Sequence, residues 1–121
     1  MDYTDLEVWI ESRKLANLAY ESTRNFPKEE LFALANQIRR CAVSIPSNIA
    51  EGCGRRTSKD TLQFLHIARG SLYELETQFY IALDQKYITD DDFIIAQTKI
   101  ILCKILISGF ITYFKKLENE K

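Results

Sequence analysis

Residues 37–56 read QIRRCAVSIPSNIAEGCGRR, and this stretch decides the fold of the chain. Apolar residues recur at every third or fourth position, which is the spacing of one helix face, and the register continues across Pro46. A proline inside a helix removes one backbone hydrogen bond and bends the helix. We therefore predict one kinked helix that passes through Pro46. Gly52-Cys53-Gly54 is expected to stop it, with a glycine in the left-handed conformation.

The same periodicity extends outward and predicts four helices, over about residues 5–25, 28–52, 58–86 and 90–118. Pro27 is expected to open the second helix, because the first helical turn does not use the N–H that proline lacks. Thr57 and Thr89 each stand three residues before an aspartate, a spacing typical of helix N-terminal caps. The predicted fold is all-α, with residues 1–121 forming a single up-down-up-down antiparallel four-helix bundle.

Composition and charge limit the classes of function. The chain is 46% apolar and 27% charged, as in folded soluble proteins. With a formal net charge of −1, any contact with nucleic acid must come from a local patch. The three cysteines show no paired spacing and the N-terminus is acidic and polar, so we expect a cytoplasmic protein without a signal peptide. Lys99 and Lys104 interrupt the most apolar region, which argues against a membrane span.

The fourth predicted helix is apolar around nearly its whole circumference. Ile94, Ile101 and Ile105 lie along one line, and other isoleucines, leucines and aromatic residues lie along two more. A single bundle cannot cover a helix that is apolar on all sides. We therefore expect a homo-oligomer whose interfaces are formed mostly by the first and fourth helices.

Five stretches of the chain resemble a known protein family. They are residues 3–9 (YTDLEVW), 26–30 (FPKEE), 37–40 (QIRR), 44–52 (SIPSNIAEG) and 64–75 (FLHIARGSLYEL). The pattern resembles the four-helix-bundle family first met in intervening sequences of bacterial large-subunit ribosomal RNA genes. The stretches cover the first three predicted helices, and the fourth helix matches in character only. The resemblance implies a closed ring of five bundles, that is, a ring-shaped homopentamer.

Most members of that family have no assigned activity. One related branch is similar to the accessory protein of diversity-generating retroelements, a basic pentamer that engages nucleic acid and a reverse transcriptase. The present chain differs from that branch in its net charge of −1.

Three cations, Arg55, Arg56 and Lys59, follow the glycine-containing turn; we call them the basic turn. A helix N-terminus beside them adds backbone donors for an anion. Five copies on one rim of a ring would follow a phosphate backbone, so the basic turn is the candidate nucleic-acid site. The alternative is an ordinary solvated surface patch.

A second candidate is a polar face on the second and third helices, where buried charges must be paired. One interpretation is a structural network in which Arg39 or Arg40 meets Glu74 or Glu76, and Glu51 meets Arg69. The other is a ligand or catalytic pocket. The residues of this predicted network are Arg39, Arg40, Ser44, Asn48, Glu51, Arg69, Glu74 and Glu76.

Catalysis and metal binding have little support. Ser44 and Ser47 are not placed on a strand-to-helix elbow, and the single histidine, His66, has no spaced partners. We predict no enzymatic activity, no metal and no cofactor. The chain is expected to be an oligomeric binding or assembly scaffold, with RNA or a nucleic-acid enzyme as its first candidate partner. The alternative is a purely structural scaffold for another protein, without nucleic-acid binding, and a small-molecule or enzymatic role ranks third.

Overall fold

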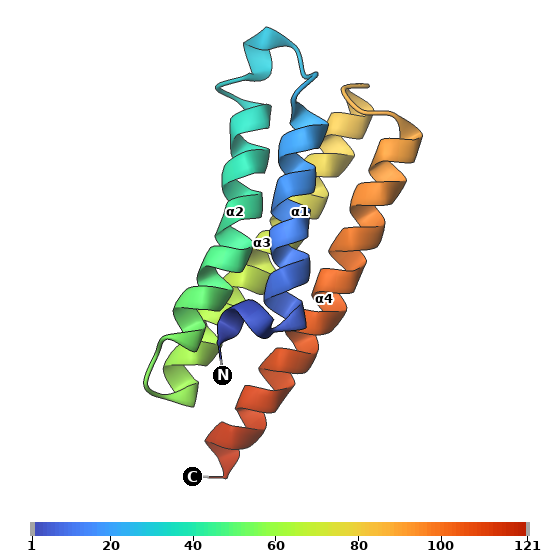
Figure 1. Ribbon diagram of the computed structural model, residues 1–121. Coiled ribbons are helices and arrows are strands. Elements are labelled where there is room, and N and C mark those ends of the chain that lie inside the picture. The colour runs from blue at the N-terminus through green and yellow to red at the C-terminus, as the bar shows by residue number, and fades with distance from the viewer. Residues whose placement is uncertain (1, 121) are drawn as a thin grey trace.

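The computed structural model describes residues 2–120 as an all-α fold. A 3-10 turn (η1, Tyr3–Asp5) precedes α1 (Glu7–Thr23), and a second one (η2, Lys28–Glu30) precedes α2 (Leu34–Cys53). Two longer helices follow, α3 (Ser58–Asp84) and α4 (Asp90–Asn119). Successive helices run in opposite directions, as Figure 1 shows. The predicted all-α class and the four helices are confirmed.

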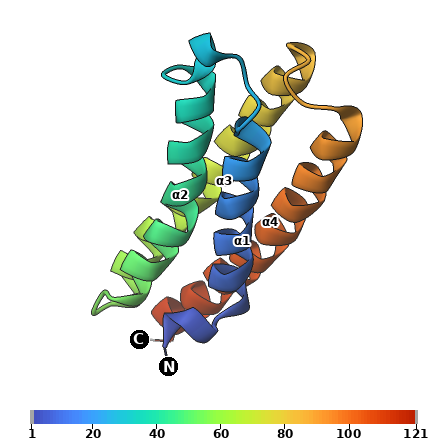
Figure 2. The same ribbon diagram turned by 45° about the horizontal axis from the view of Figure 1, so that its top comes forward.

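Each helix packs against two neighbours around a shared core. α1 and α3 both lie against α2 and α4, and Figure 2 shows the four helices arranged in this way. Leucines and isoleucines at three- and four-residue spacing fill the space between them, because that spacing keeps them on one face. The fully buried large side chains are Leu15, Ile38, Ile45, Ile49, Leu65, Leu72, Leu75, Phe79, Ile100, Ile107 and Ile111.

α2 continues through Pro46, as predicted, and Pro46 itself is buried. Ser44 Oγ donates to the Cys41 carbonyl at 2.6 Å, and Asn48 Nδ2 donates to the Ser44 carbonyl at 2.7 Å. These side chains add hydrogen bonds to carbonyls on either side of Ala42, the residue whose carbonyl loses its helical donor at Pro46. The N-terminal caps are also confirmed: Thr57 accepts from the Asp60 N–H, and Thr89 accepts from the Asp92 N–H, both at 3.1 Å.

The start of the second helix differs from the prediction. Pro27 leads only into the turn η2, and α2 begins at Leu34, because Ala33 has φ −122° and ψ −108°, outside the helical region. The segment is anchored instead by Phe26, which is buried with its ring centroid 5.2 Å from that of Tyr87. Phe32, between η2 and α2, is 89% exposed.

The end of the second helix also differs. No glycine among residues 2–120 has a positive φ, and Gly54 remains in the right-handed region at φ −86°. The importance of Gly52 is steric. A Cβ added there would meet the Phe64 Cβ at 3.1 Å and the Thr61 carbonyl oxygen at 3.3 Å. Gly52 therefore allows α2 and α3 to approach closely, and Thr61 Oγ1 donates to its carbonyl at 2.8 Å.

Candidate functional site

The basic turn lies at the end of the bundle where α2 passes into α3, and all three cations are exposed. Arg55 is held in place: its Nη2 lies 3.1 Å from Glu51 Oε1, and its guanidinium stacks 4.5 Å above the Phe64 ring. Arg56 and Lys59 form no ion pair with any carboxylate of residues 2–120. Two of the three cations are therefore free to bind an anion.

The acidic run Asp90-Asp91-Asp92 begins α4 at the opposite end of the bundle (Figure 1). The same end carries Glu29 and Glu30 in η2. Carboxylates separated from the basic turn by the length of a helix are largely screened from it by salt. The end of the bundle that carries the basic turn also holds carboxylates: Glu51, already bound to Arg55, Asp60 in the first turn of α3, and those of η1, the start of α1 and the end of α4, including Asp5, Glu7 and Glu118.

The predicted polar network is divided into separate contacts. Arg39 Nε donates to Thr23 Oγ1 at 2.8 Å, and the Arg39 guanidinium lies 5.2 Å above the Tyr20 ring, so it links α2 to α1. Ser71 Oγ lies 2.9 Å from Ser44 Oγ, and the hydrogen bond between the two hydroxyls links α2 to α3. Asn48 joins Ser44 through its carbonyl. The contacts of Arg39 and Ser44 hold neighbouring helices together, whereas that of Asn48 lies within α2.

The predicted ion pairs of this network do not form. Glu51 pairs with Arg55, just beyond the end of its own helix, and Arg69 Nη2 lies 3.2 Å from His66 Nδ1 on α3. Glu76 binds Lys104 and Gln97 of α4. The reasons differ: Glu51 and Arg69 find partners within four residues along the chain, whereas Glu76 faces α4 instead of α2.

Arg40 and Glu74 do lie near each other, on opposite sides of a shallow hollow of about 350 Å³ between α2 and α3. Its other lining residues include Ser44 and Cys41. Burial, with a smaller effect of Glu74, raises the pKa of the Cys41 thiol to about 12, so the thiol stays protonated and unreactive at neutral pH. The hollow therefore lacks an activated nucleophile.

A second hollow, of about 460 Å³, lies where η1 meets the ends of α2 and α4, and it is lined by Tyr3, Leu6, Cys53, Phe110, Tyr113 and Phe114. Burial raises the pKa of Cys53 as well. No group of three or more histidine, cysteine, aspartate or glutamate side chains within residues 2–120 is arranged to hold a metal ion.

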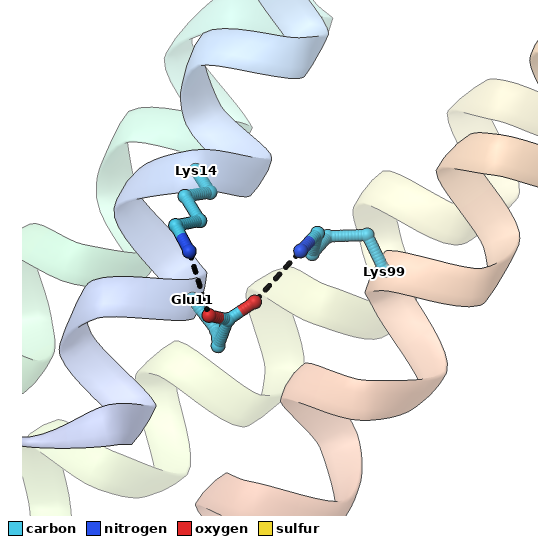
Figure 3. A network of polar contacts seen from close by, with 3 residues as sticks. All are labelled: Glu11, Lys14 and Lys99. Carbon is cyan, nitrogen blue, oxygen red and sulfur yellow. Dashed lines mark hydrogen bonds and ion pairs between the residues drawn. The ribbon is translucent and has the colours of Figure 1, made fainter.

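Two charge networks flank α4, and both were missed by the sequence reasoning. Glu11 of α1 binds Lys99 through Oε1 at 2.7 Å and Lys14 through Oε2 at 3.2 Å (Figure 3). On the other side, Glu76 Oε1 lies 2.7 Å from Lys104 Nζ. Hydrogen bonds from these lysines hold the pKa of both carboxyls below the usual value. The sequence did contain a signal for these networks. Lys99 and Lys104 interrupt an apolar helix, and charged side chains at such positions require carboxylate partners.

The outer surface of α4 is strongly apolar. Ile94, Ile101 and Ile105 follow one line of the helix and are 59%, 46% and 65% exposed. By length and hydropathy alone α4 would also be able to cross a membrane, the one such helix in the described part of the chain. However, Lys99 and Lys104 on its flanks form ion pairs with carboxylates of α1 and α3, so these flanks of α4 pack within the bundle.

These features define a class: a small up-and-down helical bundle with an exposed apolar helix and a basic turn. Residues 4–109 match the family described as 23S rRNA-intervening sequence protein, and the chain belongs to this family. No match was found among curated proteins.

Solved structures share this fold. One of them is a protein of unknown function from the S23 ribosomal protein family of Bacteroides thetaiotaomicron. The TM-score is 0.77 at 23% sequence identity, over 86% of the present chain and 97% of the other. The likeness establishes the bundle fold.

Proposed function

We propose that this chain is a non-enzymatic scaffold that assembles into a ring of five bundles and binds RNA through its basic turns. The observation that carries the proposal is the exposed line Ile94, Ile101 and Ile105 on α4. Large contiguous apolar surface on a soluble bundle marks a protein interface. A ring in which every copy has the same orientation covers this line and presents all basic turns on one rim.

The RNA part of the proposal is supported by charge. Arg56 and Lys59 are exposed and have no ion-pair partner among the described residues, and the acidic run of α4 is at the far end. Each phosphate that such a cation neutralises releases condensed counterions, which favours binding at low salt. Repetition around a ring raises the local positive potential although each chain has a net charge of −1.

The test measures RNA affinity against salt for the unaltered protein and for Arg56→Glu/Lys59→Glu. We expect affinity to fall steeply with salt and to be abolished in the variant. Arg24→Glu/Lys28→Glu is the matched control, because it changes the net charge equally at the opposite end of the bundle and should retain binding. An unaltered protein that ignores RNA at low salt would refute the RNA part of the proposal.

The second candidate is a structural scaffold for another protein, without nucleic acid. It is favoured by Phe32, an aromatic ring 89% exposed between η2 and α2, since buried aromatic anchors dominate protein interfaces. Co-purification of one protein that survives nuclease treatment, and is lost in Phe32→Ala, would favour this candidate.

A further inference from the structure

His66 is surrounded by positive charge from two helices. Arg69 lies one turn further along α3, with Nη2 3.2 Å from His66 Nδ1. Lys115 of α4 also acts on the imidazole: after burial, the positive charges of Arg69 and Lys115 lower the pKa of His66. We call His66, Arg69 and Lys115 the cationic cluster.

The register between α3 and α4 also places Lys115 close to His66. Lys104 of α4 lies over the Tyr73 ring at 4.1 Å and binds Glu76 of α3 at 2.7 Å. α3 and α4 are antiparallel and rise equally per residue. Moving three turns further along α4 from Lys104 reaches Lys115, and moving three turns back along α3 from Glu76 reaches Leu65, beside His66.

Neither Arg69 nor Lys115 has an ion pair within residues 2–120. Like charges gathered without a counter-charge destabilise the fold that gathers them. An oxyanion placed between them removes this repulsion, and a cluster of arginine, lysine and imidazolium donors is the chemistry that binds phosphate.

We propose that His66, Arg69 and Lys115 bind a phosphate group, and that in the assembled protein this group belongs to the backbone of the bound RNA. Lys59, on the same side of α3 two turns before His66, joins the cluster to the basic turn. The assignment of this phosphate group to RNA rests on the proposed function, whereas the binding of a phosphate group by the cationic cluster does not. Tyr73, exposed one turn beyond Arg69, offers a ring beside the path for a base to stack on.

Binding should couple to protonation of His66. Burial, Arg69 and Lys115 together lower the pKa of His66 in the free protein, so the ring is neutral near pH 7. A bound phosphate stabilises the imidazolium and raises this pKa. RNA should therefore bind more tightly as the pH falls, by about tenfold if the rise is about one pH unit.

The single histidine makes the experiment direct. The ring resonances of His66 are titrated with pH by proton NMR in three solutions of equal ionic strength: sodium chloride, sodium sulfate, and sodium chloride with a single-stranded RNA oligonucleotide. Sulfate represents a free tetrahedral oxyanion. We expect the pKa to rise with RNA in the unaltered protein and to rise less in Arg69→Gln and Lys115→Gln. Arg24→Gln, at the other end of the bundle, should behave as the unaltered protein does.

The outcomes separate the two proposals. If RNA binds through Arg56 and Lys59 but leaves His66 unmoved, the inference is overturned and the proposed function stands. If sulfate raises the pKa but RNA does not bind, the cluster is a site for small oxyanions, and both its RNA assignment and the RNA-binding function fail. If neither ligand moves His66, the cluster binds no phosphate. His66→Gln provides the functional readout, because it should remove the pH dependence of RNA affinity while retaining binding at pH 8.

Discussion

At the scale of single residues, Lys86 shows how a local backbone requirement is met by an unfavourable residue. It lies just after α3 with φ 63°, in the left-handed region. The Tyr87 N–H donates to the Ala82 carbonyl at 2.9 Å, and this bond closes the Schellman motif that ends the helix. Glycine is the usual residue at this position, because any side chain there costs free energy.

We therefore expect Lys86→Gly to stabilise the protein by about 0.5–1 kcal/mol. The measurement is the free energy of unfolding in urea. Lys86→Ala is the control, since it removes the charge but keeps the Cβ, and it should have little effect. A gain of equal size in both variants would attribute the effect to the lysine charge instead of to the backbone.

Gly52 is the second position where one residue decides local packing. An added methyl group would meet Phe64 and Thr61 within 3.3 Å, where the end of α2 packs against α3. Overpacking of this kind costs about 1–3 kcal/mol. Gly52→Ala should therefore lower the free energy of unfolding by that amount. Gly54→Ala, where the nearest atom is 3.5 Å away, should be nearly neutral. Equal losses in both variants would contradict the steric explanation.

At the scale of elements, α4 is fixed to the bundle by one ion pair on each flank. Glu11 binds Lys99 across the contact with α1, and Glu76 binds Lys104 across the contact with α3. Both pairs are partly buried, so removing one partner leaves a charge without its counter-charge. The pairs also fix the rotation of α4, because each lysine reaches a different neighbour.

These pairs predict a dependence of stability on pH. The lysine hydrogen bonds depress the pKa of Glu11 and Glu76 in the folded state below 4.5. Their stabilisation is complete above the pKa of the unfolded carboxyls and is lost as the pH falls through the folded pKa. The free energy of unfolding should decrease less between pH 6 and pH 3 in Glu11→Gln/Glu76→Gln than in the unaltered protein. Glu21→Gln/Glu29→Gln, with two exposed carboxylates, should keep the original slope. Identical slopes in all three proteins would disprove the assignment.

At the scale of the whole molecule, one face of the bundle remains without a partner. The core is complete, yet isoleucines of α4 stay exposed in a single chain. The proposed ring covers this surface and brings repeated charges together on one rim. In this proposal assembly and RNA binding are linked, since a single basic turn would have few phosphate contacts.

A charge on this surface should therefore dissociate the ring. We expect the unaltered protein to form particles of about five chains by light scattering, and Ile105→Glu to form monomers with the helical content retained, because Ile105 is outside the core. Ile67→Glu on α3 is the matched control, also an exposed isoleucine, and should remain assembled. A monodisperse monomer of the unaltered protein at micromolar concentration would end the ring hypothesis.

The sequence by itself determined the number of helices, the course of α2 through Pro46 and the threonine caps, because these depend on contacts within a few residues. Most core positions followed from the same periodicity. The tertiary structure alone decided which charged groups meet between helices: Glu11 of α1 with Lys99 of α4, and Glu76 of α3 with Lys104 of α4. It also decided the steric role of Gly52 and the grouping of His66, Arg69 and Lys115. The physical reason is that a pairing between helices depends on their relative rotation and register, which periodicity within one helix leaves open.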